Sequence, residues 1–109
     1  MIKFRCAKGA TLRIPYAVQS NDGELWSVSR CAMRKRNAGV LEGLAVDIPT
    51  EARAATATIP AGFNAVLTAT ASSALDAGEY QLDAFISVGS DIMETEPILI
   101  VIFEAASSE

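Results

Sequence analysis

Strict alternation of apolar and polar side chains is the feature that most limits how this chain can fold. Its longest example ends at residue 88 and places Tyr80, Leu82, Ala84, Ile86 and Val88 at every second position. Successive side chains of a β-strand point to opposite faces of the sheet, so a period of two puts one apolar face against a core. The segment is therefore predicted to be a strand that is buried on one side.

Shorter alternating stretches recur along the chain, and turn residues separate them. They are predicted to be strands and cover residues 11–19, 30–36, 44–48, 55–59, 65–70, 92–95 and 98–103. Clusters of Gly, Pro, Asn and Asp lie between them, as hairpins and loops require. About eight strands at intervals of roughly 8–12 residues are typical of a sandwich. We therefore predict an all-β, Ig-like Greek-key sandwich of antiparallel strands.

One domain with one core suits a chain of 109 residues, and residues 104–109 are expected to be a short polar tail. Pro15 has no N–H to donate, so the strand over residues 11–19 is predicted to lie at a sheet edge or to contain a bulge. The predicted core consists of Leu12, Ile14, Val18, Leu67, Leu75, Tyr80, Leu82, Ile86, Ile100 and Ile102.

Two alanine-rich segments offer a rival interpretation. Residues 51–58 and 65–77 could each be helical, because alanine is the best helix former. Threonine at every second position within them favours strands instead. We keep the all-β prediction for both segments.

The stretch from Leu75 to Tyr80 predicts how the chain crosses between sheets. Leu75 is expected to enter the core, Gly78 to allow the turn, and Tyr80 to open the next strand facing inward. A buried tyrosine needs a partner for its hydroxyl, and an upstream backbone carbonyl is within reach in such a corner. This is the tyrosine corner of Greek-key sandwiches, a device of folding that is silent on function.

The composition argues against several classes of function. The chain has no histidine, and it has no glycine-rich phosphate loop, so we expect no enzyme, no cofactor and no bound metal. A net charge of −4 disfavours binding to nucleic acid and docking on anionic membranes. Cys6 and Cys31 are expected to be reduced, core-filling residues of a protein made in a cytoplasm, and the sequence does not tell whether they are close in space.

Six residues are candidates for an interface. In the closing run 98–103, alternation buries Ile98, Ile100 and Ile102, so Leu99, Val101 and Phe103 face the other way and need cover from a partner or from the chain itself. Arg34 and Arg36 belong to a basic run that could meet an acidic partner or could simply be a solvated strand end. Trp26 is either an interface residue or a plug at one end of the sandwich.

Several short motifs together resemble a known family. They are Gly9-Ala10-Thr11 before a strand, Asp22-Gly23 followed by Trp26, a strand that ends in residues 34–39, and the spacing of Leu75, Ala77, Gly78, Tyr80 and Asp83, with Thr95 before the closing strand. From Gly9 to about Phe103 the chain is similar to the small Ig-like tail, neck and baseplate proteins of phages and prophages, including the N-terminal domain of the phage baseplate upper protein. Asp76 and Ala77 stand where that family usually has a proline.

This resemblance implies a non-catalytic structural component of a virion. Such a protein would act by association with other virion subunits or with itself, first in the host cytoplasm during assembly and then in the virion. An accessory β-sandwich that binds carbohydrate or a protein partner is the alternative, with Trp26 or loop residues as its recognition surface. A small enzyme is the third class, and the missing catalytic residue types disfavour it.

Overall fold

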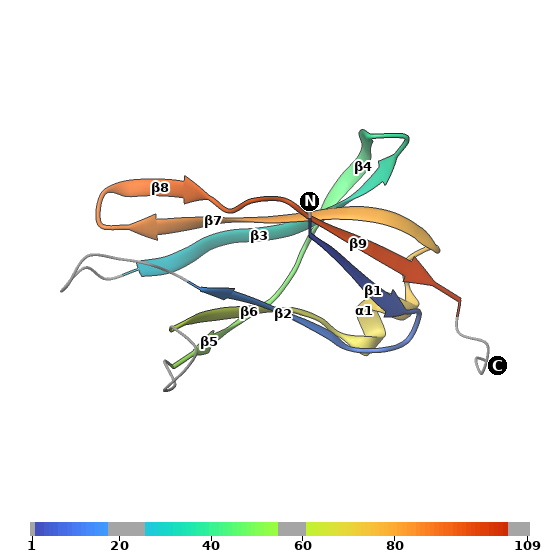
Figure 1. Cartoon of the computed structure of the whole chain (residues 1–109), viewed down its shortest axis with the longest axis horizontal. Helices are drawn as coiled ribbons and strands as arrows, with labels where there is room; N and C mark the ends of the chain where they lie inside the picture. The colour runs from blue at the N-terminus through green and yellow to red at the C-terminus, as the bar shows by residue number, and fades with distance from the viewer. Residues whose placement is uncertain (1, 18–25, 55–60, 105–109) are drawn as a thin grey trace.

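The computed structural model describes residues 2–17, 26–54 and 61–104. Two β-sheets pack face to face around one hydrophobic core, which confirms the all-β sandwich (Figure 1). The described residues form nine strands and one short helix: β1 (Lys3–Ala7), β2 (Leu12–Ala17), β3 (Trp26–Asn37), β4 (Val40–Asp47), β5 (Thr50–Arg53), β6 (Gly62–Leu67), α1 (Ala69–Ser73), β7 (Gly78–Val88), β8 (Asp91–Glu94) and β9 (Ile98–Phe103).

The larger sheet, here called sheet A, has the strand order β1-β9-β7-β3-β4, and β8 pairs with β7 as well. The smaller one, sheet B, has the order β2-β6-β5. Pro15 therefore lies in an edge strand, as predicted, since β2 has a neighbour on one side within sheet B.

The prediction of wholly antiparallel sheets is wrong for one pair, because β1 runs parallel to β9. After β1 the chain turns at Gly9, whose φ is +91°, and continues into β2 of the opposite sheet. β1 therefore does not pair with β2, the next strand in the sequence, and pairs with β9 instead. A strand over residues 3–7 was not predicted from the sequence.

The segment after β6 is part strand and part helix, so the strand predicted for residues 65–70 is wrong beyond Leu67. Thr68 caps the helix: its Oγ1 accepts a hydrogen bond from the Ala71 N–H at 3.2 Å. With that cap in place, the helix preference of alanine prevails over residues 69–73. The other alanine-rich segment begins as strand β5, and its predicted strand 55–59 lies outside the described residues.

The helix α1 is tied to the turn between β1 and β2. Ser72 is fully buried, and its Oγ donates to the Ala10 carbonyl at 2.7 Å and accepts from the Gly9 N–H at 3.1 Å. A buried hydroxyl with both donor and acceptor partners costs little free energy. The two connections that close this end of the sandwich are therefore joined through one side chain.

The predicted core is largely confirmed. Two of its members, Leu12 and Leu75, are only partly buried against the core, and Val18 lies outside the described residues. The predicted core lacked Phe63 and Met33, which are 0% and 1% exposed. The predicted core residues that are buried are Ile14, Leu67, Tyr80, Leu82, Ile86, Ile100 and Ile102.

The strand β4 departs from the prediction that residues 44–48 are half-buried. Leu44 is 92% exposed and Val46 41% exposed, and Ile48 is buried only after the strand has ended. In the described residues sheet B has three strands, and β4 stands away from them in Figure 1, so no strand of sheet B covers β4. Local alternation shows that a strand has an apolar face, but not whether another sheet reaches it.

The tyrosine corner is confirmed. Tyr80 is 5% exposed, and its hydroxyl donates to the backbone carbonyl of Asp76 at 2.9 Å. Gly78, between them, has a φ of +147°, which side chains other than glycine rarely adopt. Leu75 packs partly buried against the core at the end of α1. The corner thus fixes where β7 begins and which of its side chains point inward.

Replacing Tyr80 by phenylalanine is expected to lower the free energy of unfolding by about 0.5–1.5 kcal/mol, because one buried hydrogen bond is lost. Chemical denaturation of both proteins measures the difference. Asp76→Ala is the matched control, since it keeps the accepting backbone carbonyl and should leave the unfolding midpoint nearly unchanged. Equal midpoints for the wild type and Tyr80→Phe would contradict a stabilising corner.

Candidate functional site

The side chains of sheet A that point away from sheet B form a surface that we call the outer face. In β7 the inward positions are buried, so the alternate positions, Glu79, Gln81, Asp83 and Phe85, belong to the outer face. The strand registers extend this assignment across the sheet, because directly paired residues share a face. The outer face is therefore defined by pairing, strand by strand.

The strand β9 supplies an apolar stripe to this face. Ile98, Ile100 and Ile102 are buried, whereas Leu99, Val101 and Phe103 remain partly exposed, as the alternation predicted. This strand is not an edge strand, because β1 and β7 flank it. Its backbone is thus satisfied within the chain, and only its outward side chains are available to a partner.

A cationic group from β1 covers part of the stripe. The guanidinium carbon of Arg5 lies 4.9 Å from the centre of the Phe103 ring. Cation–π contacts of this kind contribute about 0.5–1 kcal/mol at exposed sites. Phe103 is therefore partly shielded, and the pairing of β1 with β9 places Lys3 beside Leu99 and Arg5 beside Val101.

Arg34 and Arg36 lie on the same outer face, on β3. Arg34 pairs with Gln81 and Arg36 with Glu79, both outward residues of β7. The Nε of Arg34 also donates to the carbonyl of Gly43 in β4 at 2.8 Å. Five of the six candidate interface residues thus share one face, with the basic and apolar groups on either side of β7.

Trp26 does not belong to this surface. It begins β3, is half-buried, and its ring centre lies 6.2 Å from that of Phe63 in the core. Its position fits the alternative of a plug at the end of the sandwich, and a role of Trp26 in an interface at that end stays a prediction. Asp22 and Gly23, which precede Trp26 in the motif noted above, lie outside the described residues.

Exposed apolar residues on β4 and β8 were missed. In β4, Val40 is 62% and Leu41 37% exposed, and in β8, Ile92 is 68% and Met93 47% exposed. None of these four side chains had been assigned to a core or to an interface from the sequence. Their exposure could have been predicted only from the tertiary arrangement, which shows which strands the other sheet covers.

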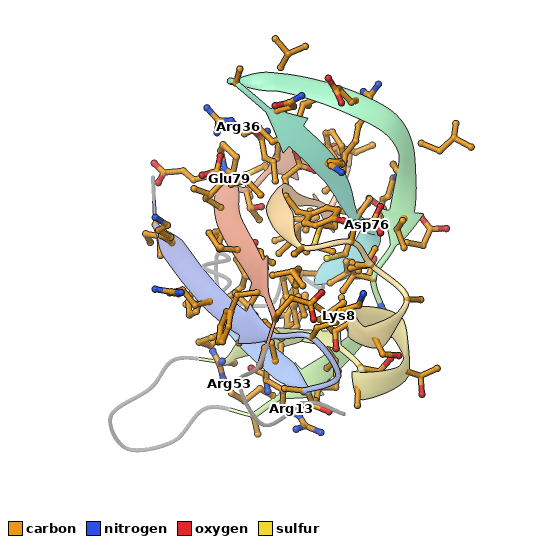
Figure 2. All side chains as sticks on the ribbon, turned by 90° about the vertical axis from the view of Figure 1, so that its right-hand side faces the viewer. Lys8, Arg13, Arg36, Arg53, Asp76 and Glu79 are labelled. Carbon is orange, nitrogen blue, oxygen red and sulfur yellow. The ribbon has the colours of Figure 1, made fainter. Side chains whose placement is uncertain are left out.

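The outward side of sheet B differs, because hydrogen bonds join its polar groups. Glu51 Oε1 accepts from Arg13 Nε at 3.1 Å and from Asn64 Nδ2 at 3.0 Å, and Arg53 donates to Asn64 Oδ1 at 3.1 Å. The hydrogen bond from Asn64, with Arg13 beside it, lowers the pKa of Glu51. Figure 2 shows Arg13 and Arg53 on the sheet B side, away from Arg36 and Glu79 on the outer face.

Both cysteines are buried, free thiols within the same hydrophobic core, as expected for core-filling residues. Burial raises the pKa of the Cys6 thiol, and burial, with a smaller contribution from Asp83, raises the pKa of Cys31 to about 11. A thiol with a raised pKa is a poor nucleophile near neutral pH, because it is the thiolate that reacts.

The raised pKa of Cys31 predicts a loss of stability in alkali. Above pH 9.0 the unfolded chain releases the thiol proton while the folded chain retains it up to about pH 11. The unfolded state then binds fewer protons, so the free energy of unfolding should fall by on the order of 1–3 kcal/mol across this window and stay constant below it.

Denaturation at a series of pH values checks this prediction, with Cys31→Ala as the control. The wild type should lose more stability than the variant between pH 9 and about pH 11. Parallel curves for the two proteins would mean that Cys31 titrates alike in the folded and unfolded states.

Comparisons with protein-family models, with curated proteins and with solved structures found no match to this chain. Within residues 2–17, 26–54 and 61–104, no group of three or more acidic, cysteine or histidine residues is arranged to hold a metal ion. The described helix, α1, has five residues and is too short to cross a membrane.

Proposed function

We propose that this chain is a non-catalytic structural component of a phage or prophage virion, in the tail, neck or baseplate, and that it acts by subunit association through the outer face of sheet A. The observation that carries the proposal is the composition of that face. A partly exposed apolar stripe on β9 lies beside an acidic strand, β7, and a basic strand, β3. This combination of apolar and charged groups suits a protein partner.

The energetics of the stripe support association. Leu99, Val101 and Phe103 follow one another at every second position of β9. Full burial of an exposed large apolar side chain contributes about 1.5–3 kcal/mol, and these partly exposed residues would gain a fraction of that on association. Soluble monomers rarely expose contiguous apolar patches of large area, so such a stripe is typical of an interaction surface.

The strand order supports the Ig-like part of the proposal. In an Ig sandwich, strands B, E and D form one sheet and G, F and C the other, which C′ extends in the variable type. Counting along this chain, β2-β6-β5 occupy the B-E-D positions, and β9-β7-β3-β4 the G-F-C-C′ positions. Tyr80 opens the strand in the F position, where the tyrosine corner of that fold stands.

The resemblance to small phage proteins supports the virion assignment. The spacing of Leu75, Gly78 and Tyr80 that it rests on forms a real corner in the structure. The partners of such a component are other virion subunits or further copies of the chain. Its location would be the host cytoplasm during assembly and the virion afterwards.

An accessory binding module for carbohydrate or a protein partner is the second candidate. It is favoured by a hollow of about 320 Å³ that Trp26 and Phe63 help to line. Phe63, however, is 0% exposed, and Trp26 is half-buried against it. Sugar stacking needs an open aromatic face, so we rank this function below assembly.

Mass spectrometry of purified particles tests the proposal, with the chain supplied as wild type or as Val101→Lys in a host that lacks the native gene. We expect the particles to contain the wild-type chain and to lack the lysine variant, because the variant has a charge in the middle of the apolar stripe.

Val66→Lys is the matched control, since Val66 is a partly exposed valine on the outward side of sheet B. Both variants should fold, with unfolding free energies within about 1 kcal/mol of the wild type. Absence of the wild-type chain from the particles would overturn the virion assignment. Equal incorporation of the two valine variants would overturn the role of the outer face.

A further inference from the structure

One row of the outer face has a self-complementary order. Leu41 pairs with Arg36, Arg36 with Glu79, and Glu79 with Val101, so the four lie side by side across β4, β3, β7 and β9. Across these four strands the row is apolar, basic, acidic and apolar, and Arg5 of β1, which pairs with Val101, continues it beyond β9. Figure 2 shows its two central residues, Arg36 and Glu79, close together on the same side of the molecule.

A two-fold axis brings this row onto itself. If the axis runs parallel to the strands, between β3 and β7, it turns a second copy so that the outer faces meet. Each β3 then lies over β7 of the second copy, and each β4 lies over β9. Arg36 faces Glu79 of the second copy, and Leu41 faces Val101, so both kinds of contact are favourable and each occurs twice.

The neighbouring positions agree with this arrangement. Arg30 and Arg34 continue the basic strand β3, and Asp83 continues the acidic strand β7. Between the two arginines, the partner of Asp83 is Ala32, a small residue that leaves room for charged side chains on either side. The same rotation sets Asp83 over Ala32 of the second copy, diagonal to Arg30 and Arg34, so no like charges face one another directly on these two strands.

We propose that two copies of this chain associate face to face through the outer face of sheet A, related by a two-fold axis between β3 and β7. The inference rests on the proposed function in treating this face as an assembly surface, and it adds the identity of the partner. Arg36 also has contacts within its own chain. In the dimer, the arginine and glutamate of both copies form one cluster in which the signs alternate.

Edge-to-edge pairing through β4 is the competing geometry, and the shape of β4 disfavours it. Its pairing with β3 shifts register between Met33 and Lys35, and Gly43 in this region has a φ of +73°. The Gly43 carbonyl is also taken by Arg34. A bulged edge is a common way in which proteins prevent strand addition.

Charge reversal at the centre of the row tests the proposal by sedimentation velocity of the purified chain. The wild type should form a dimer that weakens as salt is added. Arg36→Glu and Glu79→Arg should each weaken self-association by at least about tenfold, because like charges then meet across the interface. An equimolar mixture of the two single variants should dimerise again, since positions 36 and 79 are then both acidic in one copy and both basic in the other.

Mixing is the decisive step, because it cannot repair a contact within one chain. Arg13→Glu and Glu51→Arg are the control pair, as these residues form an exposed ion pair on sheet B at 3.1 Å. They should leave dimerisation unchanged, alone and mixed. A monomeric wild type, or a mixture of the Arg36 and Glu79 variants that stays monomeric, overturns the two-fold dimer.

The outcome is separable from that of the proposed function. If the chain is monomeric but still enters particles in a way that depends on Val101, the virion role stands and the proposal of a second copy as partner is wrong. If the chain is dimeric but absent from particles, the two-fold dimer stands and the virion role is wrong.

Discussion

Burial of one apolar face of each sheet against the other is the interaction on which the rest of this structure depends. Residues such as Ile14 and Phe63 in sheet B meet Leu82 and Ile100 in sheet A, all at most 1% exposed. Because side chains of a strand alternate, this choice also determines which residues point outward. The outer face of sheet A is thus a direct consequence of the core. A shift of register by one residue would exchange the inward and the outward side chains of a strand.

Much of the fold was predictable because its information is local. The alternation in β7 and β9 predicted both strands and their inward residues, and the spacing from Leu75 to Tyr80 predicted the corner. The failures concern information that is not local. The parallel pairing of β1 with β9 joins the two ends of the chain, and the exposure of β4 depends on how many strands the other sheet has.

The candidate site was predicted in part for the same reason. Which side of β9 holds Val101 follows from alternation, but that Val101 shares a row with Glu79, Arg36 and Leu41 follows from the registers of three strand pairs. Trp26 shows the limit of residue type: tryptophan suggested either an interface or a plug, and only its place at the start of β3, near Phe63, favours the plug. The residue types indicated which side chains could belong to an interface, and the strand pairing shows which of them lie on the same face.

Chemical labelling of carboxylates in the assembled state tests most directly whether the outer face of sheet A is the buried one. A carbodiimide and an amine would modify exposed Glu and Asp side chains, and peptide mass spectrometry would compare the isolated, dilute chain with the chain in particles. The account predicts strong protection of Glu79 and Asp83 on assembly and unchanged labelling of Glu51 on sheet B. Equal labelling of Glu79 in both states would contradict the claim that this face is the assembly surface.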